Sequence, residues 1–377
     1  MLRLAVILRR HRGVIALFGF VSGVASFVLV DRQEGFGRVI PLVMLVSWLW
    51  LVMENVLQHW LDVRFRFRLP APVLRYATQL VHQESLFFVL PFVVLATVWN
   101  SAQALFTGAL ICAALVSVID PVYYRWLAPR RWLYLGFHTL ALFVVLLTVL
   151  PMLLQVPTSH SYMYALLAAV VLSFPSLAVA ITLRARWRKL LLVLLVATLG
   201  VVGWHGRFWV PPAALRLAQM EVALELDREN RAPQDPVREV STAQLRERGL
   251  YAYTAINAPL GLQERIYHVW IFEGTEVDRI PLDIRGGRED GYRAWTHKRS
   301  FPQDAAGRWR IEVVTESGQM VGRLRFQVVE GPAAARPEVP AEALPEPPPA
   351  DLPPGLLPEP ERPALPDTGA DSVPARD

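Results

Sequence analysis

A series of apolar stretches, separated by short polar loops, fills the first 204 residues of the chain. A helix needs about 20 mainly apolar residues to cross the hydrocarbon core of a bilayer. We therefore predict seven transmembrane helices, at residues 13–30, 39–57, 85–99, 102–119, 132–154, 162–183 and 190–204. Hydrophobic residues make up 53% of the chain, a share that favours a membrane protein over a soluble enzyme.

The loops between these stretches differ strongly in charge. Starting from the N-terminal segment, alternate loops contain fifteen Arg and Lys residues, whereas the other short loops contain only Arg32 and Arg38. Because Arg and Lys are retained on the cytoplasmic side of membrane spans, this bias predicts a cytoplasmic N-terminus and an extracytoplasmic segment after residue 204. The net charge of +5 resides largely in these loops, so we expect no nucleic-acid partner.

The predicted cytoplasmic loop at residues 58–83 contains a short alternation of apolar and basic residues at 63–69. We predict that this segment lies in the membrane interface, with its rings at the acyl boundary. Arg64, Arg66 and Arg68 would then contact anionic lipid head groups. The alternative is a loop that is basic only because it faces the cytoplasm.

Four ionisable residues lie within or at the ends of the predicted spans, all toward the cytoplasmic side: Glu54, Glu84, Asp120 and His138. An ionisable side chain in a membrane is costly, which makes each of them a candidate for function. Three carboxylates and one imidazole could relay protons or bind a cation. Alternatively, the carboxylates pair with arginines of the loops, and His138 is a buried hydrogen-bonding group between helices.

From about residue 219 the apolar pattern changes to a period of two, which is typical of strands with one buried face. The predicted strands are residues 219–227, 250–257, 264–272, 276–284, 291–298, 308–315 and 320–329. About seven short strands separated by turns predict a β-sandwich of immunoglobulin-like type. With Cys112 as the single cysteine, no internal disulfide can form, so we expect Trp270, Trp295 and Trp309 to fill the core.

Four segments of this domain together form a pattern of Trp, Arg, Gly and Phe residues: His268-Val269-Trp270, residues 291–298, Gly307-Arg308-Trp309 and Phe326-Gln327-Val328. The pattern resembles a C-terminal domain of unknown function found in bacterial envelope proteins, the 2914 family, over about residues 219–330. The helices before it resemble an uncharacterised multi-span membrane domain. This resemblance implies a bacterial envelope protein, but it implies no activity. Together with the predicted spans, the charge bias and the strands, it predicts a bacterial inner-membrane protein with a periplasmic β-sandwich.

A set of basic and aromatic side chains in the β domain is the best candidate for a binding site. Guanidinium groups and aromatic rings recognise anionic groups or sugar rings through paired hydrogen bonds and stacking. We predict that an envelope protein or glycan binds at Arg285, Arg288, Tyr292, Arg293, His297 and Lys298. The alternative is that these charges form only a solvated face.

The sequence contains no pattern that indicates a catalytic or metal centre. The spacing of His268 and His297 matches no zinc motif, and neither a nucleophile elbow nor a pair of acidic residues is visible. We therefore expect no cofactor and favour a non-enzymatic anchor, adaptor or sensor. Two alternatives are a transporter or channel with the sandwich as an accessory domain, and a membrane enzyme that acts on lipids with His138 and Glu54 as acid and base.

The end of the chain is rich in Pro, Ala and Glu and poor in aromatic residues. Such a composition cannot bury a core, so we expect disorder with polyproline II character. The predicted organisation is a seven-span transmembrane domain at residues 1–210, a periplasmic β-sandwich at 211–330 and a disordered tail at 331–377.

Overall fold

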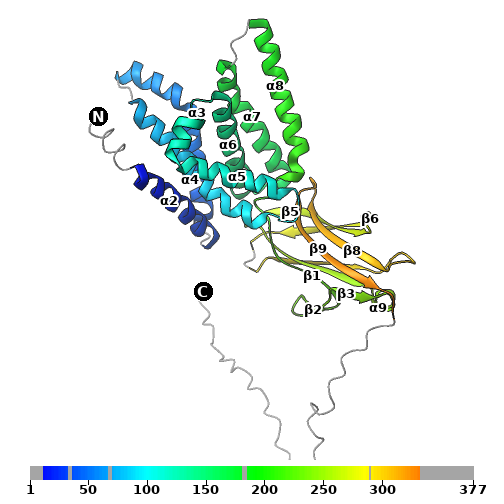
Figure 1. The fold of residues 1–377 in the computed structure, drawn as a ribbon. Helices are drawn as coiled ribbons and strands as arrows, with labels where there is room; N and C mark the ends of the chain where they lie inside the picture. The colour runs from blue at the N-terminus through cyan, green and yellow to red at the C-terminus, as the bar shows by residue number, and fades with distance from the viewer. Residues whose placement is uncertain (1–11, 33–35, 67–69, 181–184, 288–289, 332–377) are drawn as a thin grey trace, which may run out of the picture. The chain divides into compact units, whose positions relative to one another are not determined.

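The computed structural model describes residues 12–32, 36–66, 70–180, 185–287 and 290–331 and consists of a helical region followed by a β domain (Figure 1). The helical region contains α2 (Arg12–Arg32), α3 (Phe36–Phe65), α4 (Ala71–Ala96), α5 (Gln103–Val118), the π-helix η1 (Val122–Leu127), α6 (Arg131–Leu154), α7 (Thr158–Ala180), α8 (Ala185–His205) and the 3-10 helix η2 (Gly206–Trp209).

Three stretches among the described helices are long and apolar enough to cross a membrane: Val73–Ala96, Arg131–Leu154 and Lys189–Trp209. Shorter apolar helical stretches lie at Leu17–Val30, Gly37–Met53, Gln103–Val118 and Thr158–Leu172. Each of the seven predicted spans therefore overlaps an apolar helix, and three of these helices meet the length that a span requires.

The prediction of a long loop at residues 58–83 was wrong, because α3 continues to Phe65 and α4 begins at Ala71. Two prolines at the start of α4, Pro70 and Pro72, suit a helix N-terminus, where an amide N–H has no partner within the helix. Of the predicted lipid-binding arginines, Arg64 lies in the last turn of α3. Arg66 is exposed just after α3, and Arg68 lies outside the described residues.

Within the helical region, α6 is the central helix. All side chains from Ala141 to Val149 are buried, as expected for a helix that is apolar on every side. Close packing also joins α2 to α4, where a Cβ atom added at Gly23 would lie 2.7 Å from the Phe87 Cβ. Glycine at this position therefore allows the two helices to approach closely.

The outer surface of α8 is apolar and exposed. Leu190, Val193 and Val202 are 60%, 64% and 62% exposed, respectively. A monomer in water rarely leaves a continuous apolar surface of this kind uncovered, so α8 is suited to contact with lipid or with another protein.

The β domain contains two sheets and a short helix. Its elements are β1 (Arg216–Asp227), β2 (Ala232–Pro236), β3 (Glu239–Ser241), α9 (Thr242–Arg248), β4 (Leu250–Asn257), β5 (Gln263–Phe272), β6 (Thr275–Arg285), β7 (Tyr292–Lys298), β8 (Gly307–Thr315) and β9 (Met320–Val329). One sheet has the strand order β2-β1-β4-β7, and the other has the order β3-β9-β8-β5-β6. Neighbouring strands are antiparallel except β3 and β9, which are parallel.

The strands predicted from the period of two are confirmed, with bounds that differ by a few residues at most. The short strands β2 and β3 and the helix α9 were not predicted. The start of α9 has a capping box, in which the Ser241 and Gln244 side chains bond to each other's backbone N–H groups. This Ser-x-x-Gln spacing is a signal that the sequence contains for a helix start.

Two of the three tryptophans predicted for the core are buried between the sheets. Trp270 is 0% exposed and Trp309 is 1% exposed. The prediction for Trp295 was wrong, because side chains alternate along β7 and its inward positions are taken by Ala294 and Thr296. Trp295 therefore lies half-buried on the outer face of its sheet.

Polar contacts connect the β domain to one end of the helical region. The Gln103 Nε2 atom, at the start of α5, donates to the Met320 carbonyl oxygen over 2.9 Å. The Glu264 carboxylate accepts a hydrogen bond from the Thr158 backbone N–H at the start of α7, over 2.6 Å. After α8, the Val210 carbonyl accepts from Gln319 Nε2 over 3.0 Å. The α4–α5 loop, the start of α7 and the end of α8 thus lie on the same side of the helical region.

Candidate functional site

The structure divides the predicted basic and aromatic set between two faces of β7. Tyr292 packs against the core, and Lys298 is buried with its Nζ atom 2.5 Å from the Asp278 Oδ2 atom. Arg293 and His297 face the other way, because successive side chains of a strand point to opposite sides. Because the Lys298 side chain is only 6% exposed and is paired with Asp278, it is not part of an open binding surface.

The outward members of the set are held by contacts within the domain. Arg293 Nη1 donates to the Asn230 carbonyl over 2.8 Å. The His297 ring stacks on Tyr251 with 3.9 Å between ring centroids. Arg285 is exposed at the end of β6, and Arg288 lies outside the described residues. The structure therefore does not bring the five described residues of this set onto one surface.

His297 instead lines a depression of about 590 Å³ at one end of the four-stranded sheet. Its lining includes Arg228, Arg246, Arg248, Tyr251, His297 and Arg299. Arg248 is paired with Glu225 over 2.7 Å, and the Arg246 guanidinium donates to the Gln303 carbonyl. This depression is mixed in charge, because Glu225 and Glu247 also line it.

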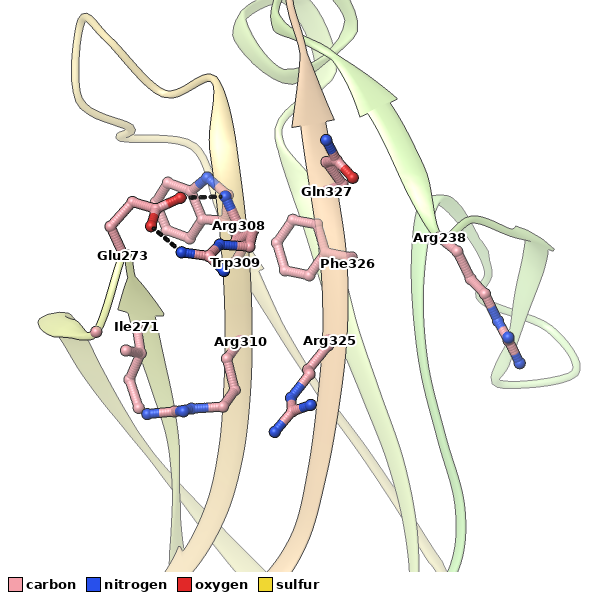
Figure 2. A pocket seen from close by; sticks show the side chains of 10 residues that line it. Arg238, Ile271, Glu273, Arg308, Trp309, Arg310, Arg325, Phe326 and Gln327 are labelled. Carbon is pink, nitrogen blue, oxygen red and sulfur yellow. Dashed lines mark hydrogen bonds and ion pairs between the residues drawn. The ribbon is translucent and has the colours of Figure 1, made fainter. Parts of the chain in front are cut away.

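A second depression, of about 640 Å³, lies on the outer face of the five-stranded sheet and is more strongly basic (Figure 2). Its lining includes four arginines and one glutamate, so positive charges exceed negative charges by three: Arg238, Arg308, Arg310, Arg325 and Glu273. We call this depression the arginine pocket. The arginines come from β8, from β9 and from the residue before β3.

The register of the sheet places like charges opposite each other in the arginine pocket. Arg310 on β8 is the direct cross-strand partner of Arg325 on β9, and Figure 2 shows the two side chains next to each other. Like charges at directly opposed positions destabilise a sheet. An anion bound between them would relieve this repulsion.

Not all of these guanidinium groups are neutralised by the protein itself. Arg308 pairs with Glu273, and the resulting hydrogen bonds hold the pKa of Glu273 below its usual value. The Arg310 Nε atom lies 3.0 Å from Glu312 but not at an angle that forms a hydrogen bond. Within the part of the chain that the structure describes, Arg238 and Arg325 have no side-chain hydrogen bond or ion pair.

The buried imidazole of His268 is hydrogen-bonded to two threonine hydroxyl groups. Its Nδ1 atom lies 3.0 Å from Thr296 Oγ1 and its Nε2 atom 3.2 Å from Thr254 Oγ1, so both ring nitrogens are satisfied. Burial lowers the pKa of His268 to about 4. Among the described residues, no group of three or more His, Cys, Asp or Glu side chains could hold a metal ion.

In the helical region, the predicted ionisable residues have separate partners. Glu84 accepts a hydrogen bond from Ser22 over 2.7 Å, and Asp120 accepts one from Gln79 over 2.8 Å. The side chain of Glu54, in α3, lies outside the described residues. The structure thus places Glu84 and Asp120 away from His138.

The partner of His138 is a second histidine that the sequence analysis missed. The His82 Nε2 atom on α4 lies 3.0 Å from the His138 Nδ1 atom on α6, and His82 Nδ1 lies 2.9 Å from the Tyr123 hydroxyl on η1. The three side chains form a hydrogen-bonded chain, which we call the Tyr-His-His chain. Trp48 on α3 packs against both imidazoles.

His82 was missed because it was placed in the predicted loop at residues 58–83. The polar side chains Gln79, His82 and Gln83 lower the local hydropathy, so the predicted span began only at Ser85. All three are buried, and Gln79 lies three residues before His82 and four before Gln83, as on one face of a helix. This spacing is the signal in the sequence that predicts a helix starting before residue 85.

The fold and these sites define a class of proteins: a helical region with helices apolar enough to span a membrane, followed by a β domain of two facing sheets. The chain belongs to the family of unknown function DUF5924, whose model matches residues 1–252. Residues 263–328 match the protein family of unknown function DUF2914, which confirms the predicted layout. No curated protein and no solved structure matches the chain.

The two family segments do not correspond to the two parts of the fold. The first extends through β1, β2, β3 and α9 into β4, and the second begins at β5. Strand pairs β4–β7 and β3–β9 join the two segments, and Val222 and Leu250 share a core with Trp270 and Trp309. The β domain is therefore built from both segments, and residues 263–328 alone lack the part of its core that β1, β3, α9 and β4 supply.

Proposed function

We propose that the chain is a multi-pass protein of the bacterial inner (cytoplasmic) membrane. In this proposal α2–α8 are seven spans, the N-terminus is cytoplasmic, and the β domain is an immunoglobulin-like sandwich in the periplasm followed by a disordered tail. The charge bias of the loops supports the orientation. The contacts of the β domain with the α4–α5 loop, the start of α7 and the end of α8 support it as well, because an alternating path places these three segments on one side.

The orientation predicts which residues a membrane-impermeant thiol reagent can reach. In a Cys112→Ser background, Asp304→Cys should be labelled in spheroplasts, whereas Ala128→Cys should be labelled only after the membrane is permeabilised. Both positions are exposed and lie outside the apolar helical stretches. Labelling of Ala128→Cys in sealed spheroplasts, with protection of Asp304→Cys, would reverse the proposed topology.

The function that the geometry supports best is non-enzymatic: the helices anchor a β domain that binds an acidic partner at the arginine pocket. The observation that carries this proposal is the excess of three positive charges in one depression, with Arg238 and Arg325 unpaired among the described residues. Arginine forms bidentate hydrogen bonds with carboxylates and phosphates, and its charge does not depend on pH in the physiological range.

Among partners in the cell envelope, the pocket favours an acidic protein segment over a glycan. Sugar rings bind by stacking on exposed aromatic faces, but the aromatic residues at the arginine pocket, Trp309 and Phe326, are only 1% and 4% exposed. The surface available to a ligand is therefore mainly polar: it consists of the guanidinium groups, the Gln327 amide and the Glu273 carboxylate that pairs with Arg308. These groups suit carboxylates spaced along an extended peptide.

The test uses the full chain in lipid nanodiscs, with a fluorescent peptide of alternating Glu and Gly residues as the probe. Anisotropy should show saturable binding that weakens with salt. Arg325→Ala and Arg238→Ala should each raise the Kd by roughly tenfold, the loss expected for a hydrogen bond to a charged group.

A matched control is Arg265→Ala, which removes one arginine from the same outer face, where Arg265 is paired with Asp283. This variant should bind the peptide as the wild type does. An oligogalacturonate probe distinguishes the glycan alternative. If only the oligogalacturonate binds, the partner is an acidic glycan and not an acidic protein segment. If neither probe binds saturably, the arginine pocket is not an anion site.

A further inference from the structure

The Tyr-His-His chain is a continuous path of groups that can each donate and accept a proton. His82 is 0% exposed and Tyr123 is 2% exposed, so the first two members are shielded from solvent. The two nitrogens that meet between the imidazoles are 3.0 Å apart, so a single hydrogen must lie between them. When the Tyr123 hydroxyl donates to His82 Nδ1, the His82 Nε2–H group donates to His138 Nδ1. In this arrangement all three side chains are neutral.

The neutral Tyr-His-His chain can bind one additional proton. If the added proton binds to His82 Nδ1, the Tyr123 oxygen becomes the acceptor of that N–H group. The His82 Nε2–H group still donates to His138 Nδ1, and movement of this shared hydrogen transfers the positive charge to His138. No bond other than N–H and O–H bonds forms or breaks, and a second added proton would place two charges on neighbouring rings.

The backbone around Tyr123 has an unusual conformation. Residues Val122–Leu127 form a π-helix, in which the Ala128 N–H donates to the Tyr123 carbonyl over 2.8 Å. π-helical turns are rare and are frequently found at functional sites. Here the turn brings a hydroxyl from the segment between α5 and α6 to the His82 ring.

Polar groups lead to the Tyr-His-His chain from one end of the helical region. Beside it, Gln79 connects Asp120 with the Ser117 carbonyl, and Tyr124 and Arg75 lie at the same end. In the other direction, α4 continues with apolar side chains after Ser85, and α6 continues with apolar side chains from Leu140 to Leu147. The chain is therefore approachable from the η1 end, which is opposite to the end that contacts the β domain.

The titratable groups around the two imidazoles are few. Tyr123 on η1 and Tyr134 on α6 have their rings next to His82, and α3 presents the indole of Trp48. Glu84 is directed to Ser22 on α2, and Asp120, after α5, is bonded to Gln79. Among the described side chains, none of these carboxylates contacts an imidazole, so the charge of an added proton is shared by the rings alone.

We propose that His82 and His138 form one proton-binding site within the helical region, loaded through Tyr123 from the η1 end. The site binds a single proton because the two rings share one hydrogen bond. This proposal does not depend on the arginine pocket. It gives the protein a means to respond to the proton concentration on the side of the membrane opposite to the β domain.

The experiment is solid-state ¹⁵N NMR of the histidine-labelled full chain in lipid bilayers, titrated from pH 8 to pH 4. In the wild type, the signals of His82 and His138 should move together and report uptake of one proton by the pair. In His138→Leu, the proton affinity of His82 should fall by roughly tenfold or more, because the hydrogen bond from the charged His82 ring to His138 is lost. Tyr123→Phe should keep the single proton but slow its exchange with water.

Tyr124→Phe is the matched control for Tyr123→Phe, since its hydroxyl bonds to the Arg75 carbonyl rather than to an imidazole. This variant should exchange at the wild-type rate. Rings that stay neutral down to pH 4, or that titrate separately and identically with and without the other ring, would overturn the proposal. The titration of the wild type shows whether the two rings take up a proton, even if a histidine variant does not fold.

Discussion

Trp309→Ala is expected to lower the free energy of unfolding of the β domain by about 3–5 kcal/mol, the usual cost of removing a large buried aromatic side chain. Trp309 is 1% exposed, and its ring stacks on Phe272 and Phe326 with centroid distances of 4.8 and 6.0 Å. Its Nε1 atom donates to the Ala305 carbonyl over 2.8 Å. The substitution therefore leaves both a cavity and an unpaired carbonyl.

The measurement is hydrogen exchange of the full chain in detergent, followed at the backbone amides of β8 and β9. Trp309→Ala should greatly speed exchange at these amides. Trp295→Ala is the matched control, because Trp295 is half-buried on the outer face of β7. Its cost should stay near the average of about 1 kcal/mol for point substitutions. Equal effects of the two substitutions would contradict the placement of Trp295 outside the core.

The β domain is expected to lose about 3 kcal/mol of stability between pH 6.5 and pH 4 through His268 alone. Burial lowers the pKa of His268 to about 4, whereas an unfolded chain has a histidine pKa near 6.5. The unfolded state therefore binds the proton more readily in this range. The contribution of His268 is fully present above pH 6.5 and is lost as the pH falls toward 4.

His268→Gln should remove this pH dependence while keeping an amide that can bond to Thr254 and Thr296. Hydrogen exchange at β5 and β7, corrected for the intrinsic pH dependence of exchange, measures the difference between the wild type and the variant. Glu264 acts in the opposite direction, because burial raises its pKa and the protonated carboxyl is favoured in the fold. Comparison with the variant cancels this contribution.

The control for His268→Gln is His297→Gln, since His297 is only half-buried on the outer face of the sheet. That variant should still show the loss of stability that His268 causes on acidification. If His268→Gln loses stability on acidification as steeply as the wild type, His268 is not the group that titrates.

The sequence alone was sufficient where a pattern repeats over many residues. The apolar runs predicted the helical region, and the period of two predicted the strands of the β domain, including β4 at residues 250–257. These predictions succeed because burial of one face, or of a whole helix, requires apolar residues at regular intervals over many positions, and such a pattern is visible in the sequence.

The prediction failed where a polar stretch is buried by neighbours distant in sequence. Gln79 and His82 are polar and were placed in a loop, yet they are 4% and 0% exposed in α4. The Ser117 carbonyl accepts from Gln79, and Tyr123 and His138 bond to His82. These partners lie far from α4 in the sequence. The local sequence therefore could not show that hydrogen bonds offset the cost of burying Gln79 and His82.

The sequence by itself determined that a helical region precedes a β domain, the approximate positions of the long helices and strands, and the charge bias that supports an orientation. Only the tertiary structure decided which charged groups meet. Arg238 is 87 positions from Arg325 in the sequence, and strand pairing between β3 and β9 brings both to one pocket. The reason is that local periodicity reports which face of an element is buried, whereas a site depends on which elements become neighbours, and hydrogen bonds and packing between distant segments decide that.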